Sequence, residues 1–79
     1  MDEKLKAIIA IISDFVDVNP DEVTVDSKLR SDLGLNSFDF VNIAVEVERE
    51  YNIKIPDVDI AQLKTVGDLL KLVEEKELV

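Results

Sequence analysis

The fold is decided by one stretch near the middle of the chain, Asn36–Tyr51, which reads N-S-F-D-F-V-N-I-A-V-E-V-E-R-E-Y. From Phe40, apolar residues recur at offsets of 3, 4, 7 and 11, the last being Tyr51. This period is typical of an amphipathic α-helix that packs one face into a core. Asparagine and serine are both favoured N-caps, and an acid in the first turn suits the helix dipole. We therefore expect a helix that begins at Asn36 or Ser37 and ends near Tyr51.

Two further helices are expected on either side of this stretch. The first runs from about Glu3 to Val18, and Asn19-Pro20 ends it because the residue before a proline is forced out of the α region. The last runs from Val66 to about Glu77 and is capped by Thr65. The apolar face of the first helix consists of Leu5, Ile8, Ile9, Ile12, Phe15 and Val16, and that of the last helix of Val66, Leu69, Leu70 and Val73. The central helix has a second apolar row, Val41 and Val45.

The connections complete an all-α fold. Residues from Pro20 to Asn36 show no regular period and predict a long ordered loop, with Gly34 in a positive-φ conformation. After an extended segment, Asp57 to Leu63 predicts a short helix capped by Asp57. The aliphatic residues expected to pin the loop are Val23, Val25, Leu29, Leu33 and Leu35. We expect one domain over residues 1–79, a small four-helix bundle of three main helices plus one short helix with a long first loop.

Composition excludes several classes of function. The 79 residues hold 18 acids and 9 bases, a net charge of −9, with no cysteine and no histidine. Disulfides, thiolate metal sites and an imidazole base are therefore excluded. The negative charge repels nucleic acid and anionic membranes and favours partners with basic patches. The longest apolar run, Ala7–Ile12, is too short for membrane insertion, and we expect a cytoplasmic protein. Nothing in the sequence demands more than a monomer, and the opening at Met1 and the polar ends favour a freestanding protein.

Little in the sequence points to catalysis or metal binding. Asp17–Asp21 opens like a calcium loop, but Glu22 and Lys28 stand where such a loop needs glycine and glutamate, so a helix end and a turn are the better interpretation. The other acids fall at polar positions, where a solvated face explains them better than an acid/base pair. The two short basic pairs, Lys4/Lys6 and Lys28/Arg30, are too small to hold a nucleic acid. We expect a protein that is not an enzyme and holds no metal.

The segment Asp32–Asp39, D-L-G-L-N-S-F-D, contains the candidate functional residue, Ser37. A serine at a helix start is usually only a cap, and with no histidine to activate it Ser37 is not expected to be a nucleophile. As an acceptor of a modifying group it is well placed, because the free N–H groups of a helix N-terminus suit a phosphate ester.

Leu33–Asp39 resembles the phosphopantetheine attachment motif of acyl carrier proteins. The resemblance extends over nearly the whole chain, through Asn19–Leu29, Ile53–Asp57 and Lys64–Val66. It implies a single acyl-carrier domain in which Ser37 bears 4′-phosphopantetheine, transferred from coenzyme A by a phosphopantetheinyl transferase that uses magnesium. The thiol of this arm would hold acyl groups as thioesters and shuttle them between enzymes of fatty-acid, polyketide or related specialised lipid metabolism.

The same resemblance implies partners and docking residues. An acyl-loading ligase or transacylase and ketosynthase-type enzymes would dock basic patches on the second helix and the start of the third. The positions that match such contacts are Phe38, Asp39, Val45, Glu48 and Asp57. Acyl chains can fold back between the helices in this family, which makes four residues core first and cargo lining second: Val41, Ala44, Ile60 and Ala61.

Departures from the family pattern leave alternatives open. Asn36 replaces the usual aspartate before the serine, and Phe38 is bulkier than the common leucine. Residues 37–59 hold six acids and two bases, a diluted acidic face, which favours a carrier with dedicated partners over the central fatty-acid carrier. An aminoacyl, D-alanyl or peptidyl carrier would use the same arm on Ser37. A third alternative is an unmodified acidic interaction module in which Ser37 is only a cap.

Overall fold

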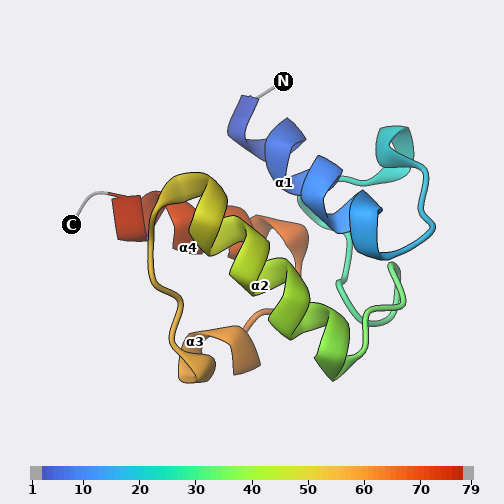
Figure 1. Ribbon diagram of the computed structural model, residues 1–79. Coiled ribbons are helices and arrows are strands. Elements are labelled where there is room, and N and C mark those ends of the chain that lie inside the picture. Colours follow the sequence, from blue (N-terminus) through green and yellow to red (C-terminus); the bar gives the residue numbers. More distant parts are fainter. Residues whose placement is uncertain (1–2, 78–79) are drawn as a thin grey trace.

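The computed structural model describes residues 3–77, which form four α-helices (Figure 1). These are α1 (Glu3–Phe15), α2 (Ser37–Tyr51), α3 (Asp57–Ala61) and α4 (Val66–Glu77), with a 3-10 turn, η1 (Pro20–Glu22), in the long first connection. Between residues 3 and 77 the only β pairing is an isolated bridge between Lys28 and Thr65. The all-α bundle of three main helices and one short helix is confirmed.

The three long helices pack on one another and share a single core. In Figure 1, α2 crosses in front of α4 and runs beside α1, and each of the three helix pairs is in contact. Ile8, Ile12, Val47 and Val73 are fully buried. Burial of one such side chain contributes roughly 1.5–3 kcal/mol. The remaining buried residues of these helices are Leu5, Ile9, Phe40, Ile43, Ala44, Val66 and Leu69.

The long first connection is ordered, and aliphatic side chains hold it in the core. Gly34 has φ +74°, the positive value predicted for it. The backbone of this connection bonds to the segment before α4, with Leu29 N donating to Lys64 O at 2.8 Å. The side chains that enter the core are Val23, Leu29, Leu33 and Leu35. Val25 does not, and the prediction that it also pins the loop is wrong.

Two helix boundaries differ from the predictions. α1 ends at Phe15 rather than near Val18, and its last turn has no base to balance the helix dipole. α3 ends at Ala61 rather than Leu63, and Asp57 is its first helical residue rather than its cap. Pro56 holds the N-cap position with extended backbone and makes no side-chain cap bond.

The start of α4 agrees with the prediction, and the capping is reciprocal. Thr65 Oγ1 accepts a hydrogen bond from Asp68 N at 3.1 Å, so Thr65 caps the helix. Asp68 Oδ2 in turn accepts from Thr65 N and Lys64 N at 3.1 and 3.0 Å. These bonds to the backbone N–H groups of Thr65 and Lys64 hold the pKa of Asp68 below its usual value.

Candidate functional site

Ser37 is the first residue of α2, and its neighbour Asn36 caps the helix. Asn36 Oδ1 accepts from Asp39 N at 2.8 Å, and Asp39 Oδ2 accepts from Asn36 N at 3.1 Å. This capping box provides the side-chain cap of the helix without the serine. The interpretation of Ser37 as only a cap is therefore wrong.

The side chain of Ser37 is exposed, and its hydroxyl makes no hydrogen bond to any of residues 3–77. The first N–H groups of a helix have no partner within the helix, and together with the helix dipole they favour a negatively charged group at this end. The hydroxyl of Ser37 is thus free, reachable and next to a favourable place for a phosphate ester.

Buried residues on both sides of Ser37 fix its position. Leu35 lies in the core, and its N–H donates to Leu29 O at 3.0 Å. On the other side Phe40 is buried, and the guanidinium of Arg30 lies 4.8 Å from the centre of its ring. Such a cation–π contact adds about 0.5–1 kcal/mol at an exposed site. The serine therefore stands between two anchors rather than on a free loop.

An apolar stripe on α2 begins beside Ser37 and faces solvent. Phe38 is 72% exposed, Val41 51% and Val45 42%. The expectation that Val41 belongs to the core is therefore wrong, as is the inclusion of Val45 in the buried face. Offsets of 3 and 7 from Phe38 place all three on one side of the helix; we call them the α2 stripe. Sequence reasoning missed Val41 as a surface residue, because its helical spacing from Phe38 and Val45 does not say which face of the helix is buried. Val58 on α3 is a further exposed apolar residue, at 68%.

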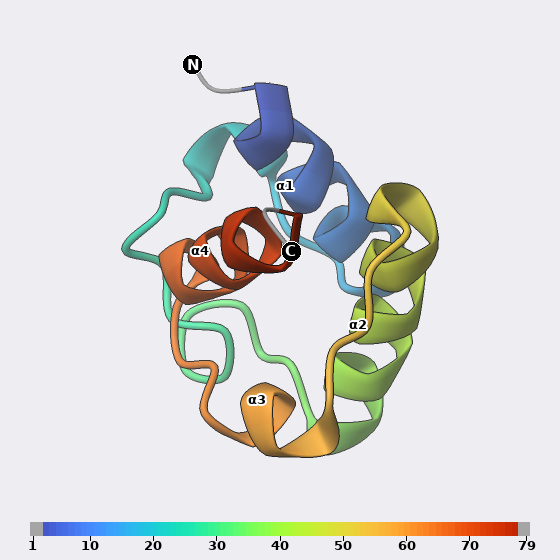
Figure 2. The ribbon, with the colours of Figure 1, turned by 90° about the vertical axis from the view of Figure 1, so that its left-hand side faces the viewer.

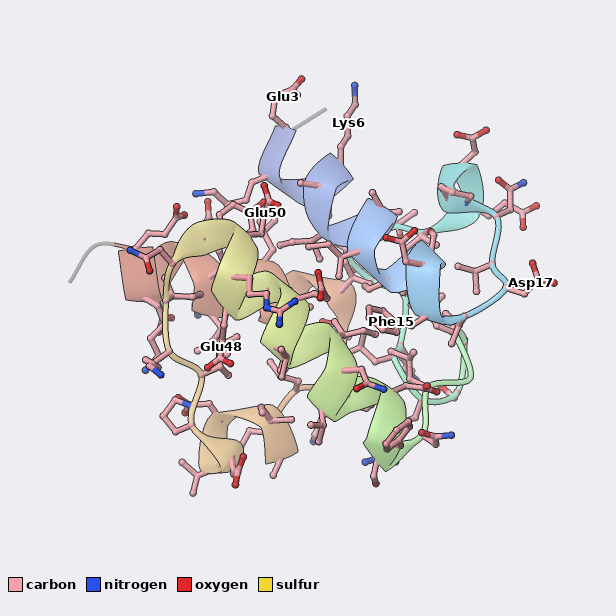
Figure 3. All side chains as sticks on the ribbon, in the orientation of Figure 1. Glu3, Lys6, Phe15, Asp17, Glu48 and Glu50 are labelled. Carbon is pink, nitrogen blue, oxygen red and sulfur yellow. The ribbon has the colours of Figure 1, made fainter. Side chains whose placement is uncertain are left out.

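Three acids and two apolar residues are expected to contact partner proteins. Two of these acids, Asp39 and Glu48, form hydrogen bonds within the chain. The carboxylate of Asp39 belongs to the cap of α2. Glu48 Oε2 accepts from Ile55 N at 2.7 Å, and Figure 3 shows Glu48 pointing from α2 toward the segment that leads to α3. Asp57, Phe38 and Val45 are exposed.

Ion pairs reduce the free negative charge further. Arg49 pairs with Glu46 on α2 at 3.3 Å, and Lys76 of α4 pairs with Asp59 of α3 at 3.3 Å. Within residues 3–77, no cluster of carboxylates is arranged to hold a metal ion.

A small apolar cavity lies in the core between α2 and the α3–α4 side. Its volume, about 10 Å³, is close to the minimum for one water molecule. The side chains around it are those of Leu29, Leu35, Phe40, Ile43, Ala44, Leu63 and Leu69. Of the four residues considered as cargo lining, Ala44 is buried beside this cavity and Ile60 is half-buried. Val41 and Ala61 are exposed, so the expectation that Ala61 belongs to the core is also wrong.

Comparison with known proteins identifies the family. The sequence model described as "Phosphopantetheine attachment site" matches residues 6–73. The acyl carrier protein of Thermotoga maritima is 35% identical over 75 residues, which is 95% of this chain and 93% of that protein. That of Rhodococcus erythropolis is 40% identical over 67 residues, 85% of this chain and 74% of that protein. The chain covers 66% of the meromycolate extension acyl carrier protein of Mycobacterium leprae, with 37% identity over 76 residues.

Solved structures agree with this result. The acyl carrier protein of Enterococcus faecalis superimposes with a TM-score of 0.80 at 28% identity, covering 94% of each chain. The apo doublet acyl carrier protein from prodigiosin biosynthesis gives 0.79 at 28% identity, covering 95% of this chain and 37% of that one. The chain belongs to the acyl carrier protein family: it is a carrier rather than an enzyme, and its cofactor is 4′-phosphopantetheine. No helix in residues 3–77 has the length and apolar character needed to cross a bilayer.

Proposed function

We propose that Ser37 is the attachment site of 4′-phosphopantetheine. The observation that carries the proposal is the free, exposed hydroxyl at the first residue of α2, beside a cap that Asn36 and Asp39 complete without it. The four serines of the chain are Ser13, Ser27, Ser31 and Ser37. Ser13 and Ser27 have hydroxyls engaged with the backbone, and Ser31 lies in the first connection rather than at the start of a long helix.

Attachment forms a bond from Ser37 Oγ to the phosphorus that bears the pantetheine group of coenzyme A. The pyrophosphate linkage breaks, and adenosine 3′,5′-bisphosphate leaves. The hydroxyl proton must pass to a base of the transferase, because this chain has no histidine and the nearby Asp39 carboxylate is held in the helix cap. When attached, the arm supplies a thiol that holds acyl groups as thioesters. The chain supplies the position of the arm and the favourable helix end for its phosphate.

The α2 stripe is the surface on which we place partner enzymes, with Asp57 nearby on α3. Exposed apolar residues next to the attachment point give a partner area to bury, and the acidic residues around them favour a basic rim. Asp39 and Glu48 contribute charge, but their side chains also hold backbone N–H groups. A charge change at either one would therefore alter the fold as well as docking.

The cargo is an acyl group, and the partners are dedicated rather than those of central fatty-acid synthesis. The bases Arg49 and Lys54 dilute the acidic face between residues 37 and 59, and the ion pair of Arg49 with Glu46 removes one more free acid. An aminoacyl or peptidyl carrier is the second candidate, since nothing at Ser37 distinguishes it. Loading by a standard fatty-acid transacylase and elongation by its ketosynthase at ordinary efficiency would contradict dedicated partners.

The attachment proposal is tested by intact mass before and after incubation with coenzyme A, magnesium and a broad-specificity phosphopantetheinyl transferase. We expect the chain to gain one phosphopantetheinyl unit and Ser37→Ala to gain none. A native chain that stays unmodified while its helices are intact by circular dichroism would overturn the proposal.

Partner docking is tested with a matched pair of valines. Val45 and Val25 are 42% and 40% exposed, but only Val45 belongs to the α2 stripe. Val45→Asp should raise the KM of the loading enzyme for the carrier about tenfold or more, as loss of a central contact does. Val25→Asp should leave that KM within about twofold, since peripheral substitutions are near-neutral. Equal effects would remove the α2 stripe from the docking surface.

A further inference from the structure

An open groove lies between the first connection and the segment that joins α3 to α4. Its volume is about 510 Å³, within the range of roughly 300–1,000 Å³ that small-molecule sites occupy. In Figure 2 the two segments run side by side on the left of the molecule, above α3. The groove is lined by Lys28, Arg30, Ser31, Ala61, Leu63, Lys64 and Thr65.

Three of the nine bases of this acidic chain line that one groove. Among residues 3–77, no carboxylate lies within ion-pair distance of Lys28, Arg30 or Lys64. The adjacent carboxylates of Asp32 and Asp68 are turned onto backbone N–H groups, and Lys64 is only the weakest of the influences that lower the pKa of Asp68. The groove therefore combines three bases that form no direct ion pair with an aliphatic wall, and the charged carboxylates of Asp32 and Asp68 lie beside it.

The backbone on both sides of the groove is fixed. Lys28 and Thr65 form the isolated β bridge, and Leu29 N donates to Lys64 O at 2.8 Å. Val66 N donates to Ser27 O at 3.0 Å just beyond them. Because the bridge joins the two walls directly, the backbone positions that carry the bases of both walls are fixed before any ligand arrives. Such preorganisation lowers the entropic cost of binding an anion.

The groove lies at the end of the molecule where α2 begins. Arg30, one of its bases, lies with its guanidinium 4.8 Å from the ring of Phe40. Phe40 is three residues after Ser37, so the two side chains share one face of the helix. Figure 2 shows the first connection, α3 and the start of α2 together at this end. A flexible arm attached to Ser37 can therefore lead into the groove.

We propose that this groove binds the free carboxylate of a carboxylated acyl group carried on the arm, that is, a dicarboxylic acid held through one end as a thioester. The proposal rests on attachment at Ser37. A carboxylate at the end of a short methylene chain would pair with the three bases and place its apolar part against Ala61 and Leu63. A plain fatty chain would leave the bases without a partner. The shared chemistry is an anion, so the phosphodiester of the arm itself is the other possible source.

The test compares three forms of the protein that all contain the phosphodiester. Ser37 is loaded with the bare arm, with an amide-linked glutaryl group, or with the corresponding glutaramoyl group, in which a neutral carboxamide replaces the carboxylate. Backbone NMR shifts of residues 28–31 and 61–65 are measured in each form. We expect a change in the glutaryl form that the other two lack and that shrinks at high salt. Equal shifts in all three forms would assign the groove to the phosphodiester and overturn the proposal.

A charge-matched pair of double variants identifies the bases. Arg30→Gln/Lys64→Gln should abolish the glutaryl-specific change, whereas Lys6→Gln/Lys71→Gln, which removes the same charge from exposed positions on α1 and α4, should preserve it. An exposed charge pair shifts an equilibrium by up to about fivefold, so loss of two bases should lower the equilibrium constant for binding in the groove by up to about 25-fold. Equal behaviour of the two double variants would overturn the proposal.

Failure of the proposal is distinguishable from failure of attachment. A protein whose mass shows full loading but which lacks the carboxylate-dependent shifts overturns the groove site alone. A protein that cannot be loaded overturns attachment at Ser37. Titration of the unmodified chain with free glutaryl and glutaramoyl pantetheine then decides the groove site independently, because preferential shifts with the glutaryl compound support it and equal shifts overturn it.

Discussion

The two apolar stripes of α2 have similar composition and opposite surroundings. Phe40, on one, is 7% exposed and packs in the core with Ile43 and Val47; Phe38, on the other, is 72% exposed beside Ser37. Both stripes have helical spacing. The period therefore predicts the helix but does not say which stripe is buried, because α1 and α4 cover only one of them. The uncovered stripe is the one that partner enzymes can reach.

The largest expected effect separates the two phenylalanines. Phe40→Ala should lower the free energy of unfolding by about 3–5 kcal/mol, because it leaves a cavity in the core and removes the partner of Arg30. Phe38→Ala should change that energy by less than about 0.5 kcal/mol, as exposed substitutions do. Urea denaturation of both variants measures the difference. Equal losses would mean that the two stripes are not distinct.

The next effect concerns Glu48, which the sequence alone presents as a surface acid. Glu48→Ala should lower the free energy of unfolding by about 1–3 kcal/mol, because the N–H of the buried Ile55 loses its acceptor. Glu48→Gln retains a side-chain oxygen and should lose less. Thermal or urea unfolding tests the pair. If Glu48→Ala were as stable as the native chain, its hydrogen bond to the segment before α3 would carry no energy.

A smaller effect distinguishes Asn36 from Ser37. Asn36→Ala removes the cap of α2 and should lower the free energy of unfolding by about 1 kcal/mol. Ser37→Ala removes a hydroxyl that has no hydrogen-bond partner and should change the free energy of unfolding by no more than about 0.5 kcal/mol. Denaturant midpoints of the two unmodified variants provide the measurement. A larger loss for Ser37→Ala would restore the serine as the cap.

The smallest effect depends on pH and concerns Asp68. Its pKa is lowered from 3.8 in the fold, because the backbone N–H groups of Thr65 and Lys64 stabilise the carboxylate. The stabilisation is thus complete above the unfolded pKa and lost as pH falls through the lower, folded one. Asp68→Asn should be less stable than the native chain at pH 7, with the difference shrinking below pH 3.8. Glu74→Gln, elsewhere on α4, serves as the charge control. A stability difference between Asp68→Asn and the native chain that does not change with pH would contradict the lowered pKa of Asp68.

Much of the fold could be predicted from local sequence. The period and cap of α2, the Thr65 cap of α4 and the positive φ of Gly34 all depend on neighbouring residues, and each is present. The end of α1 could not be predicted as closely. Asn19-Pro20 sets only the latest point at which the helix can end, and the helix ends earlier, at Phe15. Prediction of Asp57 as a cap failed because Pro56 already held that position.

The site could be predicted in part. Ser37 stands out from its motif, but its freedom from capping depends on the reciprocal bonds between Asn36 and Asp39. The exposure of Val41 and the hydrogen bond of Glu48 to Ile55 depend on how the helices pack, which local spacing does not encode. The pairing of Lys28 with Thr65 across 37 residues of sequence, which builds the basic groove, is likewise a product of tertiary structure.

The central claim is that the free hydroxyl of Ser37, rather than another serine, receives the arm. Peptide mapping by tandem mass spectrometry after incubation with coenzyme A, magnesium and transferase tests it most directly, with Ser31→Ala as the control for an exposed serine nearby. We predict one modified peptide, with the phosphopantetheinyl group on Ser37, in both the native chain and Ser31→Ala. A group found on Ser31 or Ser27, or a Ser37→Ala chain that is still modified, would contradict the account.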